Sequence, residues 1–512
     1  MMKRVLSKSQ AHYLDKVTTE DFSIQGKRLM GNAGQEVADI VRGQLLEEKI
    51  KSVLIICGKG NNGGDGISTA LKLKEKLINV HIHLLFEKEK YVGESKYFLD
   101  ICTTKKIPIT SGISIENIDC EKYSIIVDAI LGIGFRGYIR PDLIHWVKFI
   151  NESNLIIISI DIPTGLDADS GLACPIAVKS AITVTMGYEK IGMLVQNGPE
   201  FCGKIIIAQI GFPKDALRRI DKLKWYKFNE NYAEMHIEKP KLNTNKFKQG
   251  RVLIVGGSIG MTGAASLSAM GSLRIGTGLV SIITPRSINA IYENKLTEVI
   301  TIPVEDKGRG ILSFQNLDQI IANSDQADAV IIGPGIGRSE STQKLIKQLI
   351  LEINKPTVLD ADGLNPFNGK MDILNKSNSE LVITPHFGEF AKLVDSNINE
   401  ILNDFPEFMN IFMNNYKHSL LLKQVPACYF SDDNVLINIS GNPGLATAGS
   451  GDVLSGMIGG LLAAGLNMKT AVPISAFLHG KASDYIVKDK GYKGQIASDI
   501  IETIPTVLKK YE

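Results

Sequence analysis

The feature that most constrains the fold of this chain is a series of short, wholly aliphatic runs that starts, stops and starts again. From about residue 50, runs such as KSVLIIC, VHIHLLF and NLIIISIDIP alternate with amphipathic segments such as ISTALKLKEKL. Runs that are apolar at every position predict strands buried on both faces, as in parallel sheets covered by helices on both sides. We therefore expect an α/β fold.

The series is interrupted once, by a stretch of some forty residues that is rich in charged side chains and poor in aliphatic ones. It then restarts with RVLIVGG, GLVSIITP and ADAVIIGPGIG. Such a stretch predicts a domain boundary, and a chain of 512 residues is too long for a single core. We expect a first domain over residues 1–215, a boundary segment over 216–245 and a second domain over 246–512. Within the second domain, LLLKQVPACYF and NVLINIS flank the turn residues SDDN and predict a hairpin.

Composition excludes some classes of protein. Lys and Arg total 57 against 55 for Asp and Glu, so a net charge of +2 gives no long-range attraction to nucleic acid or to an anionic membrane. The six cysteines are scattered without metal-binding spacing, and we expect them to be reduced and mostly buried. MMKRVLSKSQ lacks an apolar signal core, and LSGMIGGLLAAGL is too short and glycine-rich for a membrane span. The expected location is cytoplasmic.

The first glycine loop is GKGNNGGDG, from Gly58 to Gly66. It satisfies GxGxxG, follows a predicted strand and opens a helix, which predicts a dinucleotide site with phosphate at the helix N-terminus. A tight strand-to-helix turn explains the pattern equally well. The side chains of Asn61, Asn62 and Asp65 exceed what such a turn requires.

Two later predicted strands also end in polar loops. Asp128 lies in VDAILGIGFRG, and Asp161 and Thr164 lie in IDIPTGLDADSG. Loops at the carboxyl ends of parallel strands converge on one crevice. Amide, carboxylate and hydroxyl oxygens suit an alkali or alkaline-earth cation, although each acid taken singly could cap a helix.

The second glycine loop, GNPGLATAGSGDVLSG, runs from Gly441 to Gly456 and places Asp452 where an apolar run begins. The absence of GxxxxGK[ST] argues against a Walker-type phosphate site. The amides of Ala448 to Gly451 can still surround a phosphoryl group at a helix start. Asp452 could then accept the proton of a hydroxyl that attacks the phosphate, or could simply complement the helix dipole.

Several motifs together resemble one family. LMGNAG, GKGNNGGDG, VDAILGIGFRG and IDIPTGLDADSG resemble the epimerase domain of the bifunctional NAD(P)H-hydrate repair enzymes. NKFKQGRVLIVGGSIGMTGAASLSAMGSLRIGTGLV, DADG, TPHFGEF and GNPGLATAGSGDVLSG resemble their dehydratase domain. The resemblance covers nearly the whole chain in the family's domain order. It implies a Rossmann-like three-layer first domain and a ribokinase-like α/β second domain.

For the first domain, the resemblance implies interconversion of the R and S forms of NADHX and NADPHX, the nicotinamide cofactors hydrated at C6. Asp161 would act as acid or base, and Asn62, Asp128 and Thr164 would hold K⁺. The positions implied to contact the hydrate are Asn61, Asn62, Gly63, Gly64, Asp65 and Asp161, with Gly132, Ile133, Gly134, Phe135, Arg136, Gly137 and Tyr138 as a covering segment.

For the second domain, the resemblance implies phosphorylation of the C6 hydroxyl of the S form by ADP or ATP with Mg²⁺. Phosphate elimination then restores NADH or NADPH, with Asp452 as the base. The positions implied to contact the hydrate are Ala264, Gly337, His386 and Asp452, and those implied for the nucleotide are Lys423, Gln424, Val425, Pro426, Ala427 and Gly451. We also expect a homo-oligomer.

Some positions stay open at this stage. His386 could cap a loop instead of binding substrate, and Asp360 and Asp362 of DADG could act through magnesium or cap a turn, so they are given no role. The family usually follows the nucleotide-contacting lysine with glycine and then threonine, whereas this chain has LKQVPACYF with Gln424 and Pro426. Gly31 stands where the family commonly carries glutamate.

Three alternative functions share these motifs. A small-molecule kinase would use Asp452 and its glycine loop but would leave the first domain unexplained. An oxidoreductase built on GKGNNG would predict tight NAD binding and hydride transfer. A first domain that only binds nucleotide or assists assembly would tolerate replacement of Asp161.

Overall fold

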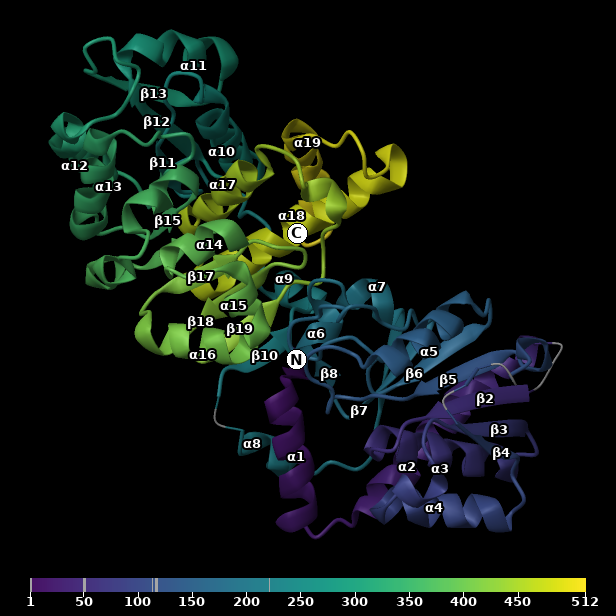
Figure 1. The fold of residues 1–512 in the computed structure, drawn as a ribbon. Coiled ribbons are helices and arrows are strands. Elements are labelled where there is room, and N and C mark those ends of the chain that lie inside the picture. Colours follow the sequence, from purple (N-terminus) through teal and green to yellow (C-terminus); the bar gives the residue numbers. More distant parts are fainter. Residues whose placement is uncertain (1, 49–51, 113, 116–117, 221) are drawn as a thin grey trace. The chain divides into compact units, whose positions relative to one another are not determined.

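The computed structural model describes residues 2–48, 52–112, 114–115, 118–220 and 222–512. It divides into two compact units, Arg4–Lys222 and a second unit formed by Leu223–Glu512 with the first residues of the chain. We call them the N-terminal and the C-terminal unit. Each is an α/β structure, purple to blue and teal to yellow respectively in Figure 1. Among the described residues, no helix combines the length and the apolar character needed to cross a membrane.

The N-terminal unit contains a parallel sheet with the strand order β4-β3-β2-β5-β6-β7-β9. Its strands are β2 (Ser52–Cys57), β3 (Asn79–Leu84), β4 (Ile109–Ser111), β5 (Ile125–Ala129), β6 (Ile156–Ile160), β7 (Ile182–Met186) and β9 (Lys204–Ala208). A short additional parallel pair joins β1 (Lys3–Leu6) to β8 (Glu189–Lys190). Helices connect β2 to β3, β3 to β4 and β5 to β6, as crossovers between parallel neighbours.

Both faces of this sheet are buried, as the sequence predicts. Alternate residues of β2 belong to different clusters: Val53 and Ile55 pack with helices on one face, and Leu54 and Ile56 pack with Trp146 on the other. The helices of this unit are α1 (Lys8–Glu20), α2 (Gly26–Gln44), α3 (Asn61–Glu75), α4 (Gly93–Thr104), α5 (Pro141–Glu152), α6 (Ile191–Leu194), α7 (Gly198–Cys202) and α8 (Lys214–Arg218). Helices α2, α3 and α4 cover one face and α5 covers the other (Figure 1).

The C-terminal unit is built on strands in the order β13-β12-β11-β14-β15-β16-β17-β18-β19-β10. Their bounds are β10 (Lys224–Lys227), β11 (Arg251–Val255), β12 (Leu279–Pro285), β13 (Ile300–Val304), β14 (Ala329–Ile332), β15 (Thr357–Leu359), β16 (Leu381–Ile383), β17 (Ser419–Leu422), β18 (Cys428–Ser431) and β19 (Asn434–Ile437). Pairing is parallel from β13 to β17 and antiparallel from β17 through β19.

Helices again cover both faces. Residues of α10, α17, α18 and α19 form the main core with one face of the sheet, and α12 and α13 lie on the other side (Figure 1). The helices are α9 (Glu230–His236), α10 (Thr262–Arg274), α11 (Asn289–Lys295), α12 (Leu317–Ser324), α13 (Glu340–Glu352), α14 (Phe387–Leu393), α15 (Ile398–Asn403), α16 (Phe405–Asn415), α17 (Ser450–Ala463), α18 (Met468–Lys490) and α19 (Ala497–Leu508).

The predicted fold class is confirmed in both units, and the hairpin needs one correction. NVLINIS pairs with CYFS as an antiparallel hairpin in which Ser431 faces Asn434. LLLKQVPACYF, however, is two strands, because the chain leaves β17 after Leu422 and starts β18 at Cys428. Lys423 therefore stands at a strand end. All six cysteines are free, and four of them are buried.

Candidate active sites

The first glycine loop connects β2 to α3 by a close backbone approach. A Cβ atom added to Gly63 would lie 1.7 Å from the carbonyl oxygen of Gly58, and one added to Gly66 would lie 2.6 Å from the Cβ of Ala129. Side chains at these positions would push the helix off the strand. The glycines let α3 begin directly above the carboxyl end of β2.

Asn62, at the second position of α3, has an unpaired side chain. It is 8% exposed, and in the described part of the chain neither its amide oxygen nor its amide nitrogen has a hydrogen-bond partner. A Cβ on Gly132 would lie 3.2 Å from the Asn62 side chain, so the loop after β5 passes close by. Because an unsatisfied buried amide costs about 1–3 kcal/mol, this side chain indicates a binding site.

Asp128 and Thr164 form a buried polar centre beside that loop. The Thr164 hydroxyl donates to Asp128 Oδ1 at 2.7 Å, and the Thr164 backbone N–H donates to Oδ2 at 2.9 Å. The hydroxyl of Ser159 also donates to Oδ2, at 2.7 Å. Asp128 does not act as the helix cap that was its alternative, since it lies within β5 near its carboxyl end, and Thr164 lies in the loop after β6.

Asp161 directly follows β6 and has the left-handed backbone angle φ 66°, which is uncommon for a residue with a side chain. Its Oδ1 accepts from Lys190 Nζ at 2.5 Å, and its Oδ2 accepts from the backbone N–H of Ile133 at 3.4 Å. The Lys190 side chain is 2% exposed. The strained backbone and the buried partner fix the direction of this carboxylate.

Asn62 and Asp161 line a cavity of about 700 Å³ in the N-terminal unit, whereas Asp128 and Thr164 lie outside its lining. Of the predicted hydrate-site residues, those that line it are Asn61, Asn62, Asp65, Gly132, Ile133, Gly134, Phe135 and Asp161. The predicted residues outside the lining are Gly63, Gly64, Arg136, Gly137 and Tyr138. Tyr138 is 81% exposed. The first part of the expected covering segment thus reaches the cavity and the second part does not.

Lining residues that escaped sequence reasoning include His12 and Asp15 on α1, and Lys190 in β8. Burial raises the pKa of Asp15 to about 6, assisted by the charge of Asp161. Burial likewise raises the pKa of Asp65 well above its usual range. Lys190 follows the strand-like run AITVTMG and could have been found by its place at a strand end, whereas Asp15 lies in an ordinary amphipathic helix.

The second glycine loop ends where α17 starts. Gly449 takes φ 86° immediately before the helix, a conformation that favours glycine. Asp452 is the third residue of α17, so its carboxylate lies in the first turn, where backbone N–H groups are unpaired. Burial, followed by the nearby charge of Asp360, raises the pKa of Asp452 to about 7. This carboxyl group is therefore poised to gain or lose a proton near neutral pH.

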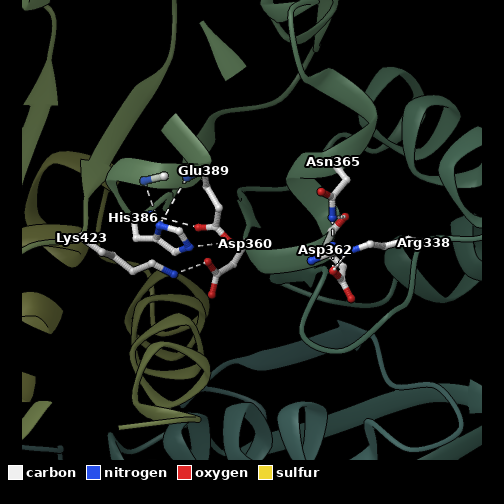
Figure 2. A network of polar contacts seen from close by, with 8 residues as sticks. Arg338, Asp360, Asp362, Asn365, His386, Glu389 and Lys423 are labelled. Atoms are coloured by element: carbon white, nitrogen blue, oxygen red, sulfur yellow. Dashed lines mark hydrogen bonds and ion pairs between the residues drawn. The ribbon is translucent and has the colours of Figure 1, made fainter. Parts of the chain in front are cut away.

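Lys423 reaches the same place from the end of β17. Its Nζ donates to Asp360 Oδ1 at 2.6 Å (Figure 2), and Asp360 also accepts a hydrogen bond from Ser455 on α17. A Cβ added to Gly451 would lie 3.2 Å from Lys423 Nζ. The predicted nucleotide-site residues Lys423 and Gly451 are thus neighbours in space, with Asp452 next in the chain.

The remaining segment of the nucleotide prediction is more open. Gln424, Pro426 and Ala427 are half-buried, and Val425 is 43% exposed. The Val425–Pro426 peptide bond is cis. This segment lies between β17 and β18, beside the strand end that carries Lys423.

The predicted hydrate-site glycine, Gly337, lies beside the second acid of DADG. Its N–H donates to Asp362 Oδ2 at 3.3 Å, and the Arg338 guanidinium donates to Asp362 Oδ1 at 2.7 Å. Ala264, at the start of α10, lies close to Gly335, where an added Cβ would approach its methyl group at 3.1 Å. Figure 2 shows that Asp362 points to Arg338 and Asn365, whereas Asp360 points to Lys423.

His386 is the N-cap of α14. Its Nδ1 accepts from the backbone N–H groups of Gly388 at 3.0 Å and Glu389 at 3.3 Å, and Glu389 accepts in return from the His386 N–H. The capping alternative is therefore observed. The ring is still 61% exposed, and the backbone N–H of Lys423 donates to Pro385 at 2.8 Å, so His386 lies at the edge of the same site.

Comparison with known families matches each unit separately. Residues 26–192 match the family described as YjeF-related protein N-terminus. Residues 252–506 match the family described as NAD(P)H-hydrate dehydratase. The two matches cover the two glycine loops and the strand ends around them.

Similar proteins extend over nearly the whole chain. A bifunctional NAD(P)H-hydrate repair enzyme of Moorella thermoacetica is 33% identical over 515 residues, covering 98% of this chain and 95% of that protein. One from Dictyoglomus turgidum is 32% identical over 510 residues, covering 99% and 98%. A ribokinase-like superfamily protein of Enterococcus faecalis, 23% identical with TM-score 0.50, covers 56% of this chain and 96% of that one and shares its fold. The chain belongs to the family of bifunctional NAD(P)H-hydrate repair enzymes.

Proposed function

We propose that the N-terminal unit interconverts the R and S forms of NADHX and NADPHX and that the C-terminal unit dehydrates the S form to NADH or NADPH. The co-substrate of the second reaction is the magnesium complex of ADP or ATP. The observation that carries the proposal is the juxtaposition of Asp452 and Lys423 at the start of α17. It supplies a base and a cation at one helix N-terminus.

The dehydration begins with phosphoryl transfer. The C6 hydroxyl of the hydrate attacks the terminal phosphorus, its proton passes to Asp452, and the bond from phosphorus to the leaving nucleotide oxygen breaks. The N–H groups of the first turn of α17 and the Lys423 ammonium stabilise the charge on the phosphoryl oxygens. The ring nitrogen then expels phosphate from C6, and loss of a proton from C5 restores the double bond of the dihydropyridine.

The epimerisation needs an acid that gives a proton and takes it back. Protonation of the C6 hydroxyl lets water leave as the ring nitrogen forms a double bond to C6, and water returns to the other face. Asp161, which lines the cavity and is oriented by Lys190, is the proposed acid and base. Asp65 and Asp15 line the same cavity, where burial raises the pKa of Asp65 well above its usual range and that of Asp15 to about 6.

K⁺ is the proposed structural ion of the N-terminal unit. The residues present fit it, because the unpaired amide oxygen of Asn62 is a hard ligand in a buried position. Asp128 and Thr164 would complete the set, linked to Asn62 through the loop at residues 130–132. The ion would supply positive charge to the cavity wall. That the chain forms homo-oligomers remains a prediction, which sedimentation velocity tests.

The decisive experiment is a crossed comparison of Asp161→Asn and Asp452→Asn by absorbance at 340 nm. Purified protein acts on separate samples of R- and S-NADHX with ATP or ADP, Mg²⁺ and K⁺. We expect Asp161→Asn to restore NADH from the S form only. We expect Asp452→Asn to restore none, while chromatography still shows it converting R to S.

Each other result points to a specific alternative. If wild type consumes nucleotide with another alcohol and restores no NADH, the C-terminal unit is a small-molecule kinase. If Asp161→Asn converts R to S at the wild-type rate, the N-terminal unit does not use this carboxylate. Either outcome contradicts the corresponding half of the proposal.

A further inference from the structure

The carboxylate of Asp360 is almost completely buried, and both of its oxygens accept hydrogen bonds. It follows β15, and its side chain is 1% exposed. One oxygen accepts from Lys423 Nζ at 2.6 Å (Figure 2) and the other accepts from the hydroxyl of Ser455. The donors come from β17 and α17, so this one side chain joins three elements of the C-terminal unit.

The two ordinary explanations for such an aspartate do not account for it. Asp360 precedes the short 3₁₀ helix Ala361–Phe367, yet its side chain makes no capping hydrogen bond there. A metal role is also disfavoured, because one of its oxygens already pairs with the ammonium group of Lys423, whose positive charge would repel a second cation. Among the described residues, no group of three or more His, Cys, Asp or Glu side chains could hold a metal ion.

Stability alone does not explain the pair either. A buried ion pair is often no more stable than apolar residues of the same volume, because both charges must be removed from water. The side chain of Lys423 is 20% exposed and that of Asp360 is 1% exposed, so the lysine is the member of the pair with an open side. Asp360 therefore holds the ammonium group of Lys423 in a fixed position.

The ammonium group of Lys423 lies beside the start of α17. Its Nζ lies 3.2 Å from where a Cβ of Gly451 would be, and Gly451 is the second residue of the helix. The attraction of Asp360 and of Glu389 outweighs burial and raises the pKa of Lys423, which stays charged. Two independent sources of positive potential, the ammonium and the helix N-terminus, thus meet at one point.

We propose that Asp360 is a positioning residue for phosphoryl transfer, which holds Lys423 over the N-terminus of α17 and keeps it from pairing with Asp452. This inference rests on the proposed dehydratase function. The charged groups that act on Asp452 are Asp360, Lys423, Asp362 and Glu389. Without the charge of Asp360, Glu389 and Asp452 are the anions left near Lys423, and a direct pair with Asp452 would neutralise both the base and the phosphate-binding cation.

The test compares the full-length Asp360→Asn variant with wild type, with kcat, KM for the nucleotide and the pH profile of NADH formation from S-NADHX as readouts. We expect kcat to fall by about 10²- to 10³-fold. The acid limb should move to lower pH by about one unit or more, because Lys423 then stabilises the charged form of Asp452. Epimerisation in the same chain should keep its wild-type rate.

The matched control is Asp432→Asn. Asp432 also pairs with a lysine, Lys469, but both side chains are 63% exposed, so removing this charge should change neither kcat nor the pH profile. A loss of activity in Asp432→Asn as large as in Asp360→Asn would overturn the inference, because the loss would then follow from removing any negative charge of the unit rather than from the position of Asp360.

A double-mutant cycle with Lys423→Met separates positioning from an unrelated structural role. If Asp360 acts through Lys423, adding Asp360→Asn to Lys423→Met should lower kcat by less than about twofold more. Fully additive losses would overturn the inference. If Asp360→Asn does not fold, Ser455→Ala provides the test, since it removes one donor to Asp360 and should shift the pH limb in the same direction by less.

Failure of this inference can be told apart from failure of the proposed function. A wild-type protein that forms no NADH from S-NADHX contradicts the proposed function itself. A wild type that forms NADH, beside an Asp360→Asn variant with unchanged kcat and pH profile, contradicts only the role of Asp360. Partial recovery in Asp360→Glu, which keeps the charge at a different reach, would support positioning.

Discussion

Both units place a buried lysine on an aspartate that follows a parallel strand, but the two pairs differ in how they meet solvent. In the N-terminal unit both members line the cavity, and the side chain of Asp161 is the more exposed of the two, at 9% against 2% for Lys190. In the C-terminal unit the roles are reversed: Asp360 is 1% exposed and Lys423 is the partner with an open side. The same pair therefore orients a carboxylate in one unit and an ammonium in the other.

This difference matches the chemistry proposed for each unit. An epimerase needs a group that exchanges protons, and an aspartate can do so. A phosphoryl-transfer site needs a fixed positive charge, with the base placed separately on Asp452. Which member of the pair reaches the open side thus indicates which one contacts substrate.

The most severe test of the comparison is Lys190→Met against Lys423→Met. Loss of Lys190 leaves Asp161 with only two long hydrogen bonds, from the backbone N–H groups of Ile133 and Met186 at 3.4 Å, and we expect about 3–5 kcal/mol lower stability of the N-terminal unit. Epimerisation should fall by about 10²-fold or more. Asp360 keeps the hydrogen bond from Ser455 in Lys423→Met, so the C-terminal unit should lose only about 1–3 kcal/mol.

The two tryptophans make this measurable in the whole protein. Trp146 lies in the N-terminal unit and Trp225 in the C-terminal unit, and both are buried. Urea unfolding followed by fluorescence in Trp225→Phe and Trp146→Phe backgrounds reports each unit separately. Equal destabilisation by the two lysine variants would contradict the asymmetry of the pairs.

A second prediction concerns pH. Asp452 must be unprotonated to accept the hydroxyl proton, and its pKa is raised to about 7 by burial and by Asp360. Dehydration should therefore be maximal above pH 7 and fall about tenfold per unit as the pH drops below it. Initial rates from S-NADHX over pH 5–9 measure this; a rate that stays constant down to pH 5 would exclude Asp452 as the base.

The third prediction sharpens the role of Lys423. In Gly451→Ala the new methyl group would lie 3.2 Å from Lys423 Nζ and displace it, so KM for the nucleotide should rise by about tenfold. In a Lys423→Met background the same substitution should have a smaller effect. Gly43→Ala on α2, where an added Cβ meets nothing within 4 Å, is the control for the substitution itself.

The smallest expected effect is that of potassium. If K⁺ binds the unpaired amide of Asn62, replacing NaCl by KCl at equal ionic strength should stabilise the N-terminal unit by about 1 kcal/mol. Thermal unfolding of the Trp225→Phe protein measures the shift. Asn62→Leu should abolish the difference between the salts, and a difference that persists in this variant would place the ion elsewhere.

Sequence patterns predicted the α/β architecture well because it depends on repetition. Each buried strand and each glycine turn leaves a local signal, and the loops that carry Asp161 and Asp452 follow directly from strand ends. The roles of Lys190 and Asp360 were harder to predict from the sequence, because they depend on partners 29 and 63 residues away along the chain. No local pattern indicates whether such a residue pairs with an opposite charge, caps a helix or binds a ligand.

The first helix illustrates a further limit. Asp15 and His12 become part of the cavity only because α1 lies over the strand ends, while its own sequence is that of an ordinary amphipathic helix. The break of LLLKQVPACYF into two strands, by contrast, did leave a local signal. Lys423, Gln424 and Pro426 interrupt the apolar run where β17 ends and before β18 begins, and a proline disfavours a continuous central strand.

The position of α1 also matters for dissecting the protein. The family match to the N-terminal unit begins at residue 26, whereas α1 spans Lys8–Glu20 and supplies His12 and Asp15 to the cavity. A fragment of the N-terminal unit that begins at residue 26 would retain every strand of the parallel sheet from β2 to β9 and the Asp161–Lys190 pair, but would lose one wall of the cavity. Such a fragment would be folded but inactive. Its inactivity would be no evidence against the activity of the intact chain.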